Sequence, residues 1–211
     1  MIDLTVITLD PTTKGGDGRN PYGLEPKMAD AGLSLGVIAA NPPVPQACWR
    51  NAMLAYWSAV IAVAEGDGKR RSQAEGTVGS LFVTPLPEPA NATAVYYVEG
   101  QMLMPLKSGG QFCIEHAWLE TEDGRVIECT LREAAAGEDG WLYFTGLRLS
   151  MDEALDWLSD NRNTLPLSPL LSRRRGAEAQ AQAHHVAMLA AYWQAWGLRL
   201  DRLDGCALAF E

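Results

Sequence analysis

One helix in the first third of the chain limits the fold more than any other feature. Residues 46–65 read QACWRNAMLAYWSAVIAVAE, with no Gly or Pro and many Ala, Leu and Met residues, which favour helix. Apolar side chains lie on nearly all sides of this predicted helix, so other elements must bury it. A Gly-Asp-Gly sequence at 66–68 ends it.

Strand-like segments follow this helix instead of alternating with further helices. They are residues 79–84, 94–104, a hairpin at 112–131, and 141–149. Strands grouped after a helix favour an α+β fold over a doubly wound one. We therefore expect the helix to pack on an antiparallel sheet whose centre is the 112–131 hairpin.

Two more helices are expected after the strands. Residues 151–159 form a short helix with Ser150 as its N-cap and Glu153 completing a capping box. Residues 177–198 form an amphipathic helix, and the stripe Tyr192, Trp193 and Trp196 is expected to pack in the core. Neighbouring helical residues point about 100° apart, so His184 and His185 are expected at the helix surface and form no shared metal site.

The chain of 211 residues is expected to form one domain with three regions. Residues 1–45 are rich in Gly and Pro, which favours an arm of loops with one strand at its start. Residues 46–150 form the core that carries the predicted site. Residues 151–211 form a helical C-terminal extension of the same domain.

Charge and cysteine spacing exclude several functional classes. The net charge is −9, which disfavours nucleic acid or an anionic membrane as a partner. The first residues lack a basic, apolar leader and no apolar segment reaches membrane-spanning length, so we expect a cytoplasmic protein. Four cysteines (Cys48, Cys113, Cys129 and Cys206) form no CxxC pair, so we expect free thiols and no metal.

Cys48 is the first candidate for chemistry. It follows the last proline of the N-terminal arm and falls in the first turn of the predicted helix. Amide groups point out of that end of a helix and favour a negatively charged sulfur, the form that acts as a nucleophile. The competing interpretation is a small buried apolar residue.

His116 and Glu128 are the second and third candidates, and their relation depends on one turn. A two-residue Asp123-Gly124 turn places Glu128 on the wrong face of the hairpin. A three-residue turn with Gly124 left-handed pairs Trp118 with Glu128, which makes Glu128 a diagonal neighbour of His116. The sequence permits both registers. In the register with the three-residue turn, Glu128 orients His116. Otherwise His116 is a core or edge histidine and Glu128 is a solvent-facing strand residue.

Four short motifs resemble a known family. They are C-x-x-N-A (Cys48, Asn51, Ala52), Y-V-E-G (97–100), E-H-A-W (115–118) and V-I-E-x-T (126–130). Over roughly residues 46–146 the chain resembles small bacterial and phage proteins of the papain-like or transglutaminase-like cysteine hydrolases. The resemblance implies a papain-like fold, Cys48 as nucleophile and His116 as base. Those proteins more usually carry Asp-Pro-Thr where this chain has Glu128-Cys129-Thr130.

Three further residues are candidates for substrate or oxyanion binding. The Gln46 amide lies just before Cys48 and can donate to an oxyanion beside the Cys48 backbone N–H. Glu99 stands in an apolar strand and precedes Gly100, which indicates a bulge or a close backbone approach. Trp118 shares a strand face with His116. Each residue also has an interpretation without a function: Gln46 as a polar residue at a helix start, Glu99 as an acid in an edge strand, and Trp118 as an aromatic residue that packs in a strand.

We therefore expect a cysteine-dependent hydrolase or acyl transferase that uses a Cys-His-acid site without a cofactor. Its expected substrate is a peptide, a protein or a small amide, attacked at an amide, isopeptide or thioester bond. The alternative is a papain-like binding module that has no activity and binds its partner in an apolar groove under Trp118. A weaker alternative is a toxin or immunity factor that acts on one host protein.

Overall fold

The structure is a computed structural model. It describes residues 22–64, 95–107, 110–150 and 178–200, with the short pieces 152–154, 156–157 and 169–170. The strands expected at 79–84 and at the start of the N-terminal arm lie outside the described residues, as does Cys206.

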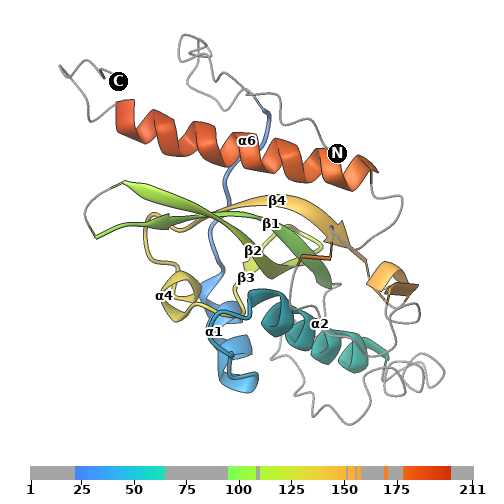
Figure 1. Ribbon diagram of the computed structural model, residues 1–211. Coiled ribbons are helices and arrows are strands. Elements are labelled where there is room, and N and C mark those ends of the chain that lie inside the picture. Colours follow the sequence, from blue (N-terminus) through green and yellow to red (C-terminus); the bar gives the residue numbers. More distant parts are fainter. Residues whose placement is uncertain are drawn as a thin grey trace.

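Helices surround a four-stranded antiparallel sheet (Figure 1). The strands are β1 (Val95–Pro105), β2 (Gln111–Thr121), β3 (Val126–Ile127) and β4 (Leu142–Leu149), in the order β3-β2-β1-β4. The helices are α1 (Ala31–Ala40), α2 (Cys48–Ala64), α4 (Arg132–Ala135) and α6 (Glu178–Leu200). In Figure 1, α6 lies above the sheet and α1, α2 and α4 lie below it. This confirms the α+β prediction.

The centre of the sheet differs from the prediction. The 112–131 hairpin is not central, because β3 is two residues long and forms one edge. The long central strands are β1 and β2, which pair along eleven residues from Val95↔Thr121 to Pro105↔Gln111. Glu99 therefore lies in a central strand and is no edge-strand acid. Turn residues in the sequence predict where a hairpin reverses. They do not predict which other strands pair with its two edges.

Helix α1 was not expected in the N-terminal arm. Its N-cap is Asp30, whose Oδ1 accepts a hydrogen bond from the Leu33 amide at 3.0 Å. Just before it, Ala29 forms a parallel bridge with Val126, and the Asp30 amide donates to the Val126 carbonyl at 2.8 Å. The described part of the arm, from residue 22, therefore includes a helix and pairs with β3 at Ala29 and Asp30.

Residues 48–57, the part of helix α2 whose side chains the structure describes, are largely buried, as the composition of the helix predicts. It contributes Ala52, Met53, Ala55, Tyr56 and Trp57 to a core whose sheet residues are Val95, Tyr97, Ala117, Leu119, Ile127, Leu147 and Leu149. Successive strand residues point to opposite faces, so Ala117 and Leu119 face this core. His116 and Trp118 then face the other side of β2, where Trp118 packs in a second core with Tyr143.

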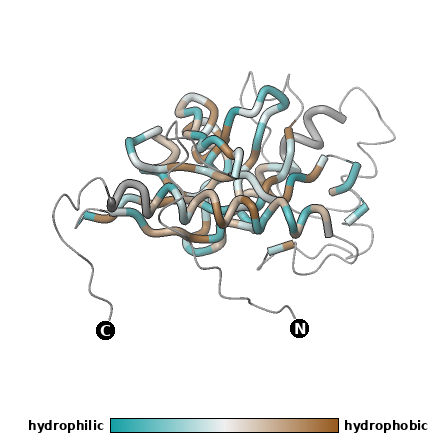
Figure 2. Tube along the Cα trace, turned by 90° about the horizontal axis from the view of Figure 1, so that it is seen from above, coloured by the Kyte–Doolittle hydropathy of each residue, from teal (hydrophilic) through white to brown (hydrophobic). Residues whose placement is uncertain are grey.

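Helix α6 confirms the predicted C-terminal helix but not its buried face. Apolar and polar residues alternate along it in Figure 2. Its buried residues are Ala187, Ala190 and Ala191, which pack on Leu103 and Phe144 of the sheet.

One member of the aromatic stripe of α6 does not match the expected core packing, because Tyr192 is 41% exposed. Trp193 is half-buried, and the side chain of Trp196 lies outside the described residues. Small alanines allow the helix to approach the sheet closely, and this turns Tyr192 toward solvent.

The two histidines of α6 occupy different environments. His185 is exposed, as expected, but the His184 side chain is only 16% exposed. His184 packs over Gly146, where an added Cβ would lie 2.8 Å from its Nδ1. The prediction of a surface His184 is therefore wrong, because Gly146 leaves room for the ring between helix and sheet.

The predicted capping box at Ser150 is confirmed. The Ser150 amide donates to Glu153 Oε2 at 2.8 Å, and the Glu153 amide donates back to Ser150 Oγ at 3.4 Å. Residues 152–154 are helical. Among the described helices, none is long and apolar enough to cross a membrane.

Candidate functional site

The turn between β2 and β3 has the three-residue form. Leu119 pairs with Ile127, and the Thr121 amide donates to the Arg125 carbonyl at 3.0 Å. Gly124 has φ 83°, a left-handed conformation that glycine adopts without strain. Continuing this register places Glu128 opposite Trp118 and on the side of His116. The structure thus selects one of the two registers that the sequence permits.

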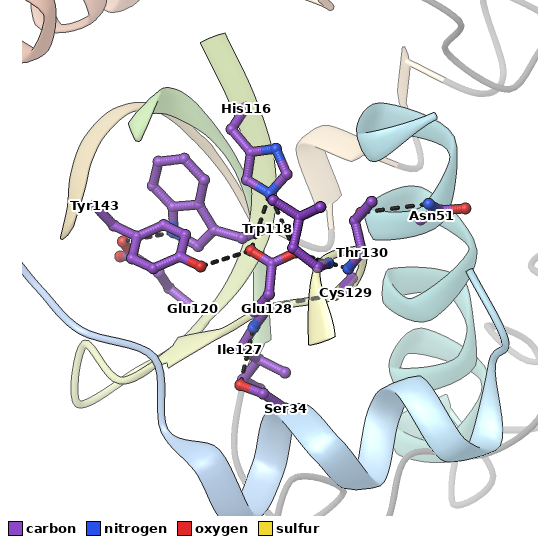
Figure 3. Close-up of polar contacts among 11 residues, drawn as sticks. Ser34, Asn51, His116, Trp118, Glu120, Ile127, Glu128, Cys129, Thr130 and Tyr143 are labelled. Atoms are coloured by element: carbon purple, nitrogen blue, oxygen red, sulfur yellow. Dashed lines mark hydrogen bonds and ion pairs between the residues drawn. The ribbon is translucent and has the colours of Figure 1, made fainter. Parts of the chain in front are cut away.

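His116 and Glu128 form a buried ion pair (Figure 3). His116 Nε2 lies 2.9 Å from Oε2 and 3.2 Å from Oε1 of Glu128. The side chain of His116 is 3% exposed and that of Glu128 is fully buried. The expected contact between the histidine and its acid is therefore present.

Other donors complete the environment of the Glu128 carboxylate. Oε1 accepts the backbone amides of Thr130 at 2.7 Å and Leu131 at 3.0 Å. Oε2 accepts the Tyr143 hydroxyl at 2.7 Å. A buried carboxylate is tolerated only when such donors replace water, and hydrogen bonds to a charged group are the strong ones.

These contacts favour the charged form of both partners. Burial lowers the pKa of His116, but the charge of Glu128 and hydrogen bonds to Cys48 and Glu128 outweigh it and raise the pKa to about 10. Burial raises the pKa of Glu128, but His116 and the hydrogen bond from Tyr143 outweigh it and hold that pKa below its usual range. At neutral pH the pair is therefore imidazolium and carboxylate.

Cys48 completes the arrangement. It is the first residue of α2, and it is among the groups that raise the pKa of His116. Because Nε2 of His116 is bound to Glu128, Nδ1 is the ring nitrogen that remains for another partner. Cys48 is partly exposed while His116 and Glu128 are buried, so of the three it is the group that a substrate can reach.

The described part of the chain holds two other cysteines, both less suited to attack a substrate. Burial, followed by the charge of Glu115, raises the pKa of Cys113 to about 11. Burial and then Glu128 raise the pKa of Cys129 well above its ordinary value. A protonated thiol is a poor nucleophile at neutral pH. Neither position competes with Cys48 as a nucleophile.

Two hydrogen-bonded anchors tie Glu128 to the helices. Its backbone amide lies beyond the β3 ladder and donates to Oγ of Ser34 on α1 at 3.0 Å. Asn51, one turn after Cys48 on α2, donates to Oγ1 of Thr130 at 3.3 Å and to the Val44 carbonyl at 2.8 Å. The start of α2 and the Glu128 segment are therefore held together.

Trp118 lies beneath the histidine and does not line an open surface. It is fully buried, its ring stacks on His116 at a centroid distance of 6.3 Å, and its indole N–H donates to Glu120 at 3.2 Å. Trp118 is therefore an internal residue of this structure, and its role in substrate binding stays a prediction. The alternation of strand residues predicts the shared face but not its depth.

Glu99 is also used internally. It is 1% exposed and accepts the Tyr97 hydroxyl at 2.8 Å and the backbone amide of Leu170. These contacts lie within the protein, and the role of Glu99 in substrate binding stays a prediction. Gly100, next to it, does mark both a bulge and a close approach, as expected from its place in a strand.

Gln46 lies in the turn before α2. It is exposed and has φ 59°, a left-handed conformation that costs a non-glycine residue about 1 kcal/mol or more. Backbone strain of this kind concentrates at functional sites. The oxyanion role of Gln46 stays a prediction.

Three residues of the site were not predicted. Ser34 belongs to the unexpected helix α1, and Tyr143 belongs to the apolar strand β4, where the sequence favours a core role for a tyrosine. Thr130 was noted only as part of a motif. Asp30, a typical helix N-cap residue, could have indicated helix α1 and therefore Ser34. No local sequence feature indicates the role of Tyr143, because its contact depends on the pairing of β1 with β4.

The described residues contain no group of three or more His, Cys, Asp or Glu side chains that could hold a metal ion. Comparisons with models of protein families, with curated proteins and with solved structures find no match to this chain.

Proposed function

We propose that this chain is a cysteine-dependent hydrolase or acyl transferase that acts on an amide, isopeptide or thioester bond. Cys48 is the nucleophile, His116 the acid and base, and Glu128 the group that orients His116. The substrate is a peptide, a protein or a small amide, and the reaction needs no cofactor.

One observation carries this proposal: a buried histidine is held at Nε2 by a buried glutamate, and the partly exposed Cys48 at the start of α2 is among the groups that raise the pKa of that histidine. That is the arrangement of an activated nucleophile, its base and an orienting acid. A histidine with only a packing role needs one hydrogen-bond partner. It requires neither a buried carboxylate nor a nearby cysteine at the start of a helix. The chain order Cys, His, acid also supports a papain-like fold, which we propose on this basis.

The chemistry proceeds in two steps. The Cys48 thiolate attacks the carbonyl carbon and forms a carbon–sulfur bond, and the imidazolium of His116 gives its proton to the leaving nitrogen or sulfur as the old bond breaks. Water or an amine then attacks the thioester while His116 removes its proton. The acyl group leaves on the oxygen or nitrogen of that second nucleophile, and the thiolate and imidazolium return.

The negative charge on the substrate oxygen needs donors during both steps. We assign this role to the Cys48 backbone N–H at the start of α2 and to the Gln46 side-chain amide. The strained φ of Gln46 supports the assignment because it directs the chain sharply into α2.

The alternative of a binding module without activity had an apolar groove under Trp118 as its motivation. Trp118 is fully buried and stacks on His116, so we favour the hydrolase or transferase interpretation over this alternative. The toxin and immunity alternatives concern the biological target and use the same chemistry.

A generic acyl donor tests the proposal without knowledge of the substrate. p-Nitrophenyl acetate should give a burst of p-nitrophenolate, and mass spectrometry should find one acetyl group on Cys48. Cys48→Ala should remove both, whereas Cys113→Ser, a matched change at a partly buried cysteine on β2, should remove neither. Acetylation that persists in Cys48→Ala would overturn the proposal.

A second arm separates hydrolysis from acyl transfer. Hydroxylamine added to the acetylated protein competes with water for the thioester. If most of the acetyl group is recovered as the hydroxamate at low hydroxylamine concentration, the chain is an acyl transferase. Recovery mainly as acetate assigns it as a hydrolase.

A further inference from the structure

The Glu128 carboxylate divides its partners unequally between its two oxygens. Oε1 accepts two backbone amides, from Thr130 and Leu131. Oε2 makes the shorter contact with His116, 2.9 Å against 3.2 Å, and its other partner is the Tyr143 hydroxyl at 2.7 Å. The oxygen that holds His116 therefore shares its lone pairs with a tyrosine.

Tyr143 is fixed in this place by the sheet and by its neighbours. Its backbone amide and carbonyl pair with Lys27 at 2.9 and 3.0 Å, and in β4 it lies opposite Met102. Its ring meets Trp118 edge to face at a centroid distance of 5.2 Å and lies 6.4 Å from the His116 ring. The hydroxyl reaches Glu128 without freedom to turn away.

The hydroxyl acts only as a donor. Burial and the charge of Glu128 raise the pKa of Tyr143 well above its ordinary value, so the proton stays on its oxygen. A donor on Oε2 does two things: it fixes the direction of the carboxylate, and it draws electron density away from the bond to His116. Both matter most when His116 has given up its proton and Glu128 is a buried carboxylate without a cationic partner.

We propose that Tyr143 is a positioning residue of the Cys48–His116–Glu128 site, holding Oε2 of Glu128 on His116 Nε2 and keeping Glu128 ionised while His116 is neutral. This rests on the proposed function. The proton moves between His116 and the leaving group or water, and Glu128 and Tyr143 keep their own protonation states throughout. The site is then a chain of four side chains from α2, β2, β4 and the segment after β3.

The test compares Tyr143→Phe with Tyr97→Phe. Tyr97 is a matched control because it is also fully buried and also donates to a buried glutamate, Glu99, at 2.8 Å. Both variants keep the ring and lose one hydroxyl, so their urea midpoints should fall by similar amounts. The kinetic readout is acetylation by p-nitrophenyl acetate and its decay, measured across pH.

We expect Tyr143→Phe to lower the rate of turnover about tenfold with KM unchanged, the effect of one hydrogen bond to a charged group. Its acid limb should move to higher pH, because His116 is held more tightly by Glu128. Tyr97→Phe should leave the pH profile of the native protein unchanged. Equal pH–rate profiles in Tyr143→Phe and Tyr97→Phe would overturn the positioning role of Tyr143.

An NMR measurement keeps this proposal separate from the function itself. The proton between His116 Nε2 and Glu128 should resonate far downfield and should shift in Tyr143→Phe but not in Tyr97→Phe. A resonance unmoved in Tyr143→Phe, or moved equally in both variants, would overturn the proposal even if Cys48 is acylated. A native protein that fails to acylate Cys48 would overturn both the proposed function and the positioning role that rests on it.

Discussion

Gly100 of β1 lies directly across the sheet from His116 of β2. A Cβ added at Gly100 would lie 2.2 Å from the Phe144 carbonyl oxygen and 2.6 Å from the Trp118 ring. The missing side chain therefore makes the space into which Trp118 leans, and Trp118 in turn supports the His116 ring at 6.3 Å. A residue with no side chain thus helps to set the position of His116, the histidine that we propose as the base.

Gly100→Ala should accordingly destabilise the fold. The first clash is with backbone, which cannot move aside, so we expect a loss near the upper end of the range for overpacking, about 3 kcal/mol. Urea denaturation measures it. Gly32→Ala, in helix α1 with its nearest contact at 3.4 Å, is the control and should be neutral or gain up to about 1 kcal/mol. Equal midpoints for the two variants would contradict the packing argument.

The three cysteines in the described residues should differ in reactivity. At pH 7 iodoacetamide should alkylate Cys48 first, because Cys113 and Cys129 have raised pKa values from burial and nearby carboxylates. Time-resolved peptide mass spectrometry gives the three rates. His116→Ala should slow the Cys48 reaction by about tenfold or more, since the thiolate loses its cationic partner. Faster labelling of Cys113 than of Cys48 in the native protein would count against the proposed nucleophile.

Glu128→Gln should reduce acylation turnover while Cys48 and His116 stay in place. The amide keeps the size of the side chain but removes the charge that stabilises the imidazolium, and we expect a loss of about 10²-fold or more. His116→Ala should abolish turnover. Glu115→Gln, the same change of charge at the residue before His116, is the control and should remain within about threefold of the native rate. A native rate in Glu128→Gln would remove Glu128 from the mechanism.

The ion pair also predicts how stability depends on pH. The folded pKa of His116, about 10, lies above its unfolded value of 6.5, so its contribution is complete below pH 6.5 and is lost as pH rises through 10. The lowered pKa of Glu128 acts in the opposite direction: its contribution is present above the unfolded value of 4.5 and is lost on acidification.

Urea midpoints measured from pH 6 to pH 10 should therefore fall more steeply for the native chain than for Glu128→Gln. The difference between the two curves isolates the pair from the other titrating groups. Parallel curves over this range would show that the pair contributes no pH-dependent stability.

The turn at Gly124 explains why part of the site could be predicted from the sequence. Turn length and the left-handed glycine together fix the register, and the register fixes which face Glu128 occupies. Similarly, helix α2 follows from its composition and from the Gly and Pro residues around it. Local rules suffice wherever the two partners are joined by a short turn.

The remaining contacts join parts of the chain that are far apart. Helix α1 contains Gly32 and Gly36 between two Pro-containing stretches, so local propensity favours loops, and packing on β3 overrides it. Tyr143 reaches Glu128 only because β4 pairs with β1 with a bulge beside Gly100. Neither partner can be read from the residues beside it, because sheet order is a property of the whole fold.

Four elements contribute to the environment of Glu128: α1 through Ser34, β2 through His116, the segment after β3 through Thr130 and Leu131, and β4 through Tyr143. The contact between Ser34 and Glu128, 94 residues apart, forms only after a long loop has closed, which is the slow part of folding. We therefore expect the candidate site to be completed late in folding. Acylation of Cys48 during refolding should then follow the recovery of helix signal.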